Sequence, residues 1–367
     1  MATTAQPEID VHARVEALVE RMFTSLTAAM DLAVVDLGDR LGLYAALAGE
    51  GPCSSGRLAI ATGTDERYVR EWLEHQAVGQ LIEVDDPDAG ATERRYSLPA
   101  GLEQAFTDPE FPGYVIPFGR FAVAAAEPIE RLVEAFRTGA GVPYADYGAR
   151  THDSIAAFNR PSFRHELAGW IASVPDVDRR LRTDPRPRVA DIGCGQGWST
   201  IALAQAYPNA LVDGFDIDAG SIEKARAHAA AVGLSERVRF VCQDAADPGL
   251  DGHYALVTLF ETLHDMAHPV GALETARRLT DEGGAVIIAD MRAAERFEPS
   301  GDPVERLLYG ASVLHCLAVG RCEHGSHETG AVMRPATLDA YAREAGFAGA
   351  EVLPIENVVW RFYRLNG

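Results

Sequence analysis

The stretch Val189-Ala-Asp-Ile-Gly193-Cys-Gly195-Gln-Gly197-Trp-Ser-Thr200 decides the fold of this chain. A short apolar strand runs into a turn with three glycines, and a helical segment follows. Glycine allows a sharp turn and a close approach to a ligand, while the start of the helix presents unpaired N–H groups. The stretch predicts a strand–turn–helix unit with a ligand at its turn, although it does not by itself identify that ligand.

The residues around the glycines separate the kinds of ligand. A dinucleotide-binding turn needs a small residue where this chain has Trp198, and a phosphate loop needs a Lys-Ser or Lys-Thr pair that does not follow these glycines. Asp191 adds a carboxylate at the end of the first strand, where a cation is more favourable than a phosphate. We therefore expect a ligand with positive charge and no pyrophosphate.

Short apolar segments and helical segments alternate after the glycine turn. This alternation is typical of a doubly wound parallel sheet. Two last strands are too close in sequence for a helical crossover, so they must pair antiparallel. The expected fold class is α/β, a mostly parallel Rossmann-like sheet that ends in an antiparallel hairpin. The expected strands are residues 188–192, 211–217, 238–242, 255–260, 285–290, 351–355 and 358–365.

The first hundred residues show a different pattern. Apolar residues at helical spacing predict a long amphipathic first helix, whose apolar stripe must be buried against something. Ser54, Ser55 and Thr64-Asp65-Glu66 are helix-start signals, and two strands flank a turn-rich stretch. Three helices and a hairpin predict a mainly helical winged-helix domain. The expected helices are residues 11–35, 36–48, a short one after 55 and 64–76, and the strands are 81–84 and 94–98.

Charge argues against nucleic acid as the partner of this domain. The would-be recognition helix mixes Glu66, Glu71 and Glu74 with Arg67 and Arg70, whereas groove binding needs an excess of cations. The whole chain has 33 Lys and Arg against 54 Asp and Glu, a formal charge of −21 that repels phosphate backbones and anionic membranes. We expect the domain to form a homodimer and to wall one side of a substrate cavity.

Length and cysteine content set the remaining limits. A chain of 367 residues predicts two domains with an additional inserted segment. It contains no apolar run of membrane-spanning length. The polar start, Met1 to Asp10, does not resemble a secretory signal, and five scattered cysteines argue for reduced thiols. We expect a cytoplasmic protein.

Two further strand ends carry acids. Asp216 follows Gly197 by 19 residues, at the position of an acid that accepts both ribose hydroxyls. Asp244, followed by Ala245, ends the third strand and offers a carboxylate to an adenine amino group. Acids at successive strand ends predict a nucleoside site, because open sheets bind ligands at that edge.

Together these residues resemble class I S-adenosylmethionine-dependent methyltransferases. The glycine motif, Asp216 and Asp244-Ala245 carry the resemblance over residues 188–292. The winged helix, Glu261-Thr-Leu-His-Asp-Met266, Met333-Arg-Pro335 and Trp360-Arg-Phe-Tyr363 extend it to small-molecule O-methyltransferases and to actinobacterial winged-helix methyltransferases. The resemblance implies a small acceptor of secondary metabolism and S-adenosylmethionine as the cofactor. No metal is expected.

The resemblance also implies roles for individual residues. Gly193, Gly195 and Gly197 would hold the methionine part of the cofactor, and Asp191 would support the loop or meet the ammonium through water. The remaining cofactor contacts would be Asp216 to the ribose, Ile217 along the adenine face, Asp244 with Ala245 at the adenine edge, and Phe260. The implied domains are a winged-helix domain over 1–100, a helical connecting and lid region over 101–184, and a methyltransferase domain over 185–367 with a substrate-lid insertion at 293–335.

The chemistry of a hydroxyl acceptor requires a base. Histidine titrates near neutral pH, and His264 follows the fourth strand, where a His-Asp-Trp segment supplies the base in the resembling enzymes. Met266 replaces that Trp, and no downstream acid partner is evident. Glu261 and Asp265 compete with His264 as catalytic groups, because carboxylates would hold an amine or guanidinium acceptor.

Other interpretations stay open. The acceptor atom can be oxygen, nitrogen or carbon. Trp198 disfavours a nicotinamide-dependent oxidoreductase, and the acidic composition disfavours a winged-helix regulator that senses S-adenosylmethionine. A metal site over Cys322-Glu-His324-x-x-His327 matches no established ligand spacing. We expect residues 304–319 to form an apolar helix that shapes the acceptor pocket together with residues 111–121.

Overall fold

A computed structural model describes residues 10–366 of the chain. Its contacts divide into two units, Met1–Val123 and Ala124–Gly367. The start of the chain, on which the expected lack of a secretory signal rests, lies outside the described residues except for Asp10. Within residues 10–366, no helix has the length and hydrophobicity that crossing a membrane requires.

The first unit contains the expected winged helix. Ser54 and Asp65 cap the starts of two helices, accepting hydrogen bonds from the backbone N–H groups of Arg57 and Arg67 at 3.4 and 3.0 Å. Strands β1 and β2 pair antiparallel. The elements are α1 (Val11–Arg40), α2 (Leu43–Glu50), α3 (Ser55–Thr62), α4 (Glu66–Val78), β1 (Glu83–Val84), β2 (Tyr96–Ser97), α5 (Glu103–Thr107) and α6 (Ile116–Ala124), the last ending one residue into the second unit.

Helix α1 is longer than predicted. It continues to Arg40, so the separate helix expected over residues 36–48 is wrong; the break comes at Gly42, whose φ of 69° suits glycine, and α2 follows. The end of α1 packs within the unit, where the indole N–H of Trp72 donates to the carbonyl of Val34 at 3.1 Å. The first five turns of α1 instead expose their apolar side chains.

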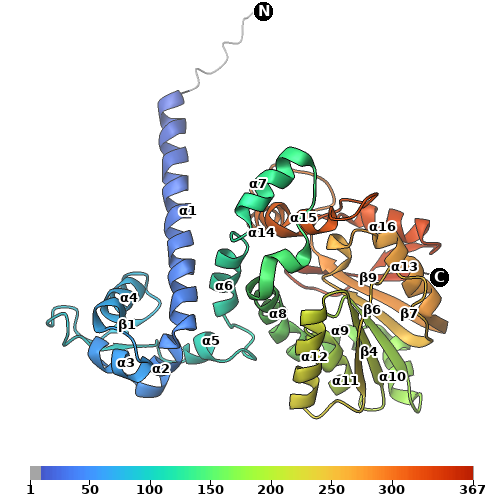
Figure 1. The fold of residues 1–367 in the computed structure, drawn as a ribbon, viewed down its shortest axis with the longest axis horizontal. Helices are drawn as coiled ribbons and strands as arrows, with labels where there is room; N and C mark the ends of the chain where they lie inside the picture. Colours follow the sequence, from blue (N-terminus) through green and yellow to red (C-terminus); the bar gives the residue numbers. More distant parts are fainter. Residues whose placement is uncertain (1–9, 367) are drawn as a thin grey trace, which may run out of the picture. The chain divides into compact units, whose positions relative to one another are not determined.

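The second unit is built on a seven-stranded sheet (Figure 1). The strand order is β5-β4-β3-β6-β7-β9-β8, parallel from β5 to β7 and antiparallel at β9 and β8. The predicted fold class is confirmed, with β9 inserted between β7 and β8. The strands are β3 (Arg188–Ile192), β4 (Leu211–Asp216), β5 (Val238–Cys242), β6 (Tyr254–Phe260), β7 (Thr280–Met291), β8 (Gly349–Val352) and β9 (Trp360–Asn366).

Helices cover both faces of this sheet. Alternate residues of β3 show the two layers: Val189 belongs to the core under α9 to α12, and Ala190 belongs to the core under α13 and α16. The order reverses at β3, with β4 on one side and β6 on the other, which is where open α/β sheets bind ligands. The covering helices are α9 (Leu167–Ala172), α10 (Pro175–Thr183), α11 (Trp198–Ala206), α12 (Ala219–Ala231), α13 (Pro269–Leu279) and α16 (Pro335–Glu344).

The remaining helices lie between these elements in the chain. The helix expected over residues 304–319 is present, but the segment changes to a π turn, η3 (Ser312–Cys316), between α14 (Pro303–Ala311) and α15 (Leu317–Gly320). The others are α7 (Ile129–Thr138), η1 (Tyr144–Tyr147), α8 (Gly148–His165) and η2 (Leu263–Asp265). The three-part division into 1–100, 101–184 and 185–367, with a lid at 293–335, stays a prediction.

Candidate active site

The three glycines of the turn after β3 have different surroundings. All have positive φ, at 68°, 50° and 81° for Gly193, Gly195 and Gly197. A Cβ atom on Gly193 would collide with the side chain of Thr262, and one on Gly197 would lie 2.6 Å from the ring of Phe240, whereas Gly195 has open space there. Gly193 and Gly195 line a cavity, while Gly197 precedes the first residue of α11. The open side of Gly195 can accept a ligand against the backbone.

Asp191 lies beneath this turn. It is 1% exposed, and its carboxylate accepts hydrogen bonds from the hydroxyls of Ser199, Thr200 and Thr258 at 2.6, 2.6 and 2.8 Å. Burial raises the pKa of Asp191, and the three hydroxyls act against that rise. These bonds join β3 to β6 and to the first turn of α11. The contacts of Asp191 therefore stabilise the glycine turn from below.

Asp216 ends β4 at the wall of the cavity. The backbone N–H groups of Gly195 and Asp218 donate to its two carboxylate oxygens at 2.8 and 2.9 Å. Burial raises the pKa of this carboxyl group. The next residue, Ile217, is 62% exposed and also lines the cavity. An oriented carboxylate beside an exposed apolar side chain can hold a ribose and an adjoining base.

The end of β5 and the end of β6 complete this side of the cavity. Asp244, Ala245 and Phe260 all line it, and the backbone N–H of Ala246 donates to a carboxylate oxygen of Asp244 at 2.8 Å. The structure therefore brings the predicted cofactor residues to one edge of the sheet, with the exceptions of Asp191 and Gly197, which lie outside the lining.

The cavity has a volume of about 430 Å³, which is within the range of small-molecule sites. Its lining contains no lysine or arginine among the described residues. Such a wall favours a cationic ligand over a phosphate. The acidic residues of the lining are Asp216, Asp218, Asp244, Glu261, Asp265 and Glu323.

Residues of η1 and α8 also contribute to the cavity wall. The ring of Tyr144 stacks on His152 with centroids 3.9 Å apart, and a ring nitrogen of His152 lies 3.0 Å from the carbonyl oxygen of Tyr144. Both residues and Asn159 line the cavity. All three residues lie within 101–184, the expected connecting and lid region, but no sequence signal singled out these side chains.

His264 lies on η2 with a partner that the sequence did not reveal. Its Nδ1 donates a hydrogen bond of 2.7 Å to the Oδ1 of Asp290. Asp290 is the residue at which the fifth strand is predicted to end. His264 is 2% exposed and Asp290 is 1% exposed. Burial alone would lower the pKa of His264, but the negative charge of Asp290 outweighs it and the pKa is raised well above its usual value. The missing acid partner is thus Asp290, on a neighbouring parallel strand.

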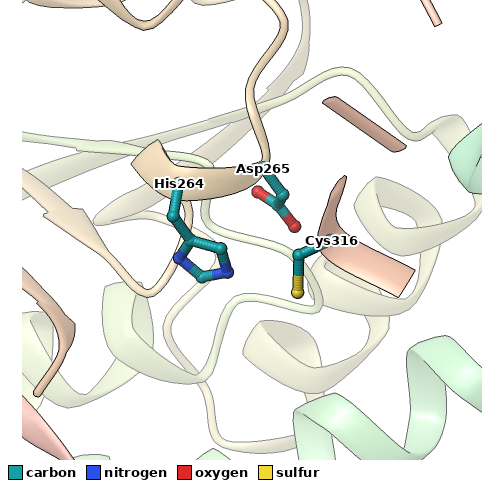
Figure 2. Close-up of side chains that lie close together, drawn as sticks. All are labelled: His264, Asp265 and Cys316. Carbon is teal, nitrogen blue, oxygen red and sulfur yellow. The ribbon is translucent and has the colours of Figure 1, made fainter. Parts of the chain in front are cut away.

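Glu261 and Asp265 form the cavity wall in front of this pair. Glu261 has a φ of 53°, a strained value for a residue other than glycine, and its Oε2 is buried with no hydrogen-bond partner among the described residues. Burial raises the pKa of Glu261 to about 7 and that of Asp265 to about 6. Strained backbone and raised pKa values of this kind concentrate at functional sites. Figure 2 shows Asp265 beside His264, with Cys316 facing both.

Family models match both units of the chain. Residues 184–323 match a model described as a methyltransferase domain, and residues 28–107 match one described as an Rv2258c-like winged HTH domain. The ubiquinone biosynthesis O-methyltransferase of Pseudomonas aeruginosa strain UCBPP-PA14 is 26% identical over 179 residues, which are 48% of this chain and 72% of that protein.

Solved structures share the fold over nearly the whole chain. The mitomycin 7-O-methyltransferase MmcR has a TM-score of 0.69 at 18% identity and covers 97% of this chain and 99% of its own. Human N-acetylserotonin methyltransferase, solved with S-adenosylmethionine, has 0.66 at 17% identity over 98% and 99%. The neocarzinostatin O-methyltransferase NcsB1, solved with the same cofactor and a hydroxynaphthoic acid, has 0.61 at 18% over 93% and 96%.

These findings confirm the class of protein. Residues 184–323 form a methyltransferase domain, and solved proteins that share the fold bind S-adenosylmethionine. More particularly, the chain joins an N-terminal winged helix to a Rossmann-like methyltransferase domain, the architecture shared with small-molecule O-methyltransferases.

Proposed function

We propose that the protein transfers a methyl group from S-adenosylmethionine to a hydroxyl oxygen of a small molecule of secondary metabolism. The observation that carries the proposal is the His264–Asp290 pair, with its 2.7 Å hydrogen bond, at the end of the sheet where acidic residues surround the cavity. A base held by a carboxylate is what a hydroxyl acceptor requires and what a pre-ionised acceptor does not.

The residues present fit the cofactor. Gly195 leaves open space against the backbone, Asp216 is oriented by two N–H groups, and no lysine or arginine of residues 10–366 lines the cavity to oppose a sulfonium. In the proposed arrangement Gly193 and Gly195 hold the methionine part, Asp216 the ribose hydroxyls, and Asp244 with Ala245 the adenine edge. Ile217 and Phe260 pack along the nucleoside, while Asp191 and Gly197 shape the turn.

The cofactor supplies a methyl group already activated by its positive sulfur. The protein therefore has to align the acceptor and take up its proton. In the proposed mechanism the other ring nitrogen, Nε2 of His264, takes the hydroxyl proton, and Asp290 stabilises the resulting imidazolium. Asp265 lines the cavity and has an oxygen within 4.8 Å of a His264 ring nitrogen, so it marks where the acceptor approaches that ring.

Glu261 and the cation-free lining favour a second candidate, an amine or guanidinium acceptor. The unpaired Oε2 of Glu261 can accept a hydrogen bond from such a group, and Asp265 lies in the same wall. The two candidates differ in their need for His264. A neutral amine needs no base, and a protonated one can lose its proton to Glu261 or Asp265, whereas a hydroxyl needs the stronger base His264. Transfer to carbon has no specific observation in its favour.

Two experiments test the proposed function. Calorimetry should show uptake of S-adenosylhomocysteine and none of NAD; the reverse would overturn the cofactor assignment. Incubating the protein with isotopically labelled S-adenosylmethionine and a metabolite extract, followed by mass spectrometry, should identify a labelled methyl ether. A labelled N-methyl product would instead select the second candidate.

We also propose that the first unit forms a homodimer through α1. Its exposed apolar side chains recur at helical spacing, and Leu18, Met22 and Leu26 are 49%, 51% and 56% exposed. Light scattering should give twice the chain mass, and Leu18→Glu with Met22→Glu should give the single mass. Glu20→Ala on the same helix is the matched control and should remain a dimer. A single mass for the unmodified protein would contradict the proposal.

The proposed role of the winged helix is dimerisation and not DNA binding. Two arginines of α4 are engaged within the helix, Arg67 with Glu71 at 2.5 Å and Arg70 with Glu66 at 3.4 Å. These pairs leave a helix surface of mixed charge, which is unfavourable for a groove. If the protein retarded random-sequence DNA in a gel at moderate salt, that result would favour the alternative of a winged-helix regulator.

The proposed location is the cytoplasm. All five cysteines are free thiols, as a reducing compartment allows. Fractionation of the producing cells should recover the protein with soluble cytoplasmic enzymes, and recovery from the culture medium would contradict this location.

A further inference from the structure

Three side chains of different chemistry converge behind the acidic wall of the cavity. One ligand atom each from His264, Asp265 and Cys316 lies within 4.8 Å of the others. Figure 2 shows them pointing toward a common centre, His264 and Asp265 from η2 and Cys316 from the end of the π turn. An imidazole nitrogen, a carboxylate oxygen and a thiolate sulfur are the three kinds of ligand that zinc takes in proteins.

The orientation of His264 suits a metal ligand. Its Nδ1 is held by Asp290, so Nε2 is the nitrogen that faces Cys316 and can bind an ion in place of its hydrogen bond to that thiol. A carboxylate that holds the far nitrogen of a ligating histidine is the usual outer partner at zinc sites, because it fixes the ring and raises its basicity. Asp290 is 1% exposed and thus held in place by the core.

The backbone at Cys316 gives a second, independent observation. Residues Ser312–Cys316 form a π turn, and such turns are found frequently at functional sites, because the wider turn changes the direction of the side chains that follow. Here the π turn ends on Cys316, which is 7% exposed and lies behind the cavity lining, beside η2.

We propose that His264, Asp265 and Cys316 form a binding site for a divalent transition-metal ion of the zinc type. Bond lengths of about 2.0 to 2.3 Å place tetrahedral ligands about 3.5 Å apart. The three atoms are within 4.8 Å of one another, so small side-chain rotations close the site. Asp265 lines the cavity, so the ion can enter there and its fourth position faces the cavity.

A bound ion has a direct consequence for catalysis, and this consequence rests on the proposed function. The ion occupies the lone pair of Nε2 that a base needs to accept a proton. Zinc is therefore an inhibitor of transfer to a hydroxyl, and removal of the ion restores the base. The metal site itself does not depend on which reaction the protein catalyses.

Cobalt spectroscopy tests the site without reference to activity. The full-length protein, reduced and freed of metal, is titrated with Co²⁺ and followed by absorption. We expect one equivalent to bind with the d–d bands of four-coordinate cobalt and a thiolate-to-cobalt charge-transfer band. Cys316→Ser should remove the charge-transfer band and weaken binding at least tenfold, and Asp265→Asn should weaken binding by a similar factor.

Cys322→Ser is the matched control, because Cys322 lines the cavity but does not belong to the cluster of three ligand atoms. This variant should keep the charge-transfer band and the affinity. Uptake of S-adenosylhomocysteine by each variant, measured by calorimetry, shows that the domain remains folded. No thiolate band in the unmodified protein, or a band lost in Cys322→Ser and kept in Cys316→Ser, would overturn the proposal.

A kinetic measurement tests the consequence separately. Zinc should inhibit methyl transfer by the unmodified protein, and the inhibition constant should rise at least tenfold in Cys316→Ser, each rate taken relative to the metal-free rate of the same variant. A cobalt site without zinc inhibition would keep the metal site and reject His264 as the base. The two proposals can therefore fail independently.

Discussion

The two sides of the cavity use carboxylates in different ways. On the cofactor side, backbone N–H groups donate to the oxygens of Asp216 and Asp244, which orient both groups. On the acceptor side, Glu261 has a strained backbone and an unpaired oxygen, and its pKa is raised to about 7 by burial. The first side is built for binding by local hydrogen bonds. The second side keeps acids of raised pKa beside a histidine that a carboxylate holds, an arrangement suited to proton transfer.

Replacing His264 should give the largest effect on turnover. A small effect would contradict the proposed difference between the two sides of the cavity. His264→Gln removes the proposed base but keeps a similar size, so turnover with a hydroxyl acceptor should fall about a hundredfold or more. Affinity for S-adenosylhomocysteine should stay unchanged, because the cofactor side is intact. His253→Gln, at a histidine whose side chain is 82% exposed, is the control. Undiminished turnover would remove His264 from the mechanism.

Replacing Asp216 tests the other side. Asp216→Asn removes the charge that accepts the ribose hydroxyls, and hydrogen bonds to charged groups contribute about 1.5 to 3 kcal/mol. We expect the affinity for S-adenosylhomocysteine to fall about tenfold to a hundredfold in calorimetry. Turnover at saturating cofactor should fall much less. A large loss of kcat with unchanged affinity would contradict the proposal that Asp216 serves cofactor binding and not the transfer step.

Asp290→Asn sharpens the comparison through its pH dependence. The base must be neutral to accept a proton, so kcat should rise with pH through the raised pKa of His264. An amide no longer stabilises the imidazolium, so the pKa of His264 should fall. The rising limb of the kcat profile should move to lower pH, while the maximum rate falls about tenfold. An unmoved profile would show that another group controls the rate.

The smallest effect concerns stability at Glu261. Between pH 4.5 and about 7 the folded protein holds a proton on Glu261 that the unfolded chain has lost, so the free energy of unfolding falls as pH rises through this window. Part of the side chain is exposed, so we expect a contribution of about 1 to 2 kcal/mol, less than the full shift implies. Glu261→Gln should unfold at higher denaturant than the unmodified protein at pH 8 and at a similar concentration at pH 5. Equal differences at both pH values would contradict the raised pKa.

The cofactor side could be predicted from sequence because its signals are local. Gly195 and Asp216 follow strands at fixed spacing, and the strand order places those ends at one edge. The acceptor side depends on pairs distant in sequence. Asp290 meets His264 only because β6 and β7 are neighbours, and Cys316 reaches it through a π turn that no residue pattern announces.

The helix boundaries show the same limit on a smaller scale. Caps such as Ser54 and Asp65 gave correct starts, because a side chain bonds to the first turn. The end of α1 was missed because residues 36–40 are compatible with either helix, and the left-handed conformation of Gly42 sets the break. Whether residues 111–121 help to form the pocket stays a prediction, since they belong to the first unit.

The π turn also makes the alignment of the acceptor wall sensitive to chain length. A π turn holds one residue more than an α turn, and each helical residue rotates the chain by about 100°. Deleting Val313, whose side chain is 43% exposed, would let the segment relax to a regular helix and would turn Cys316 away from His264 with every chemical group retained. Relatives that differ by one residue here would therefore differ in the reach of this cysteine even where the cysteine itself is present.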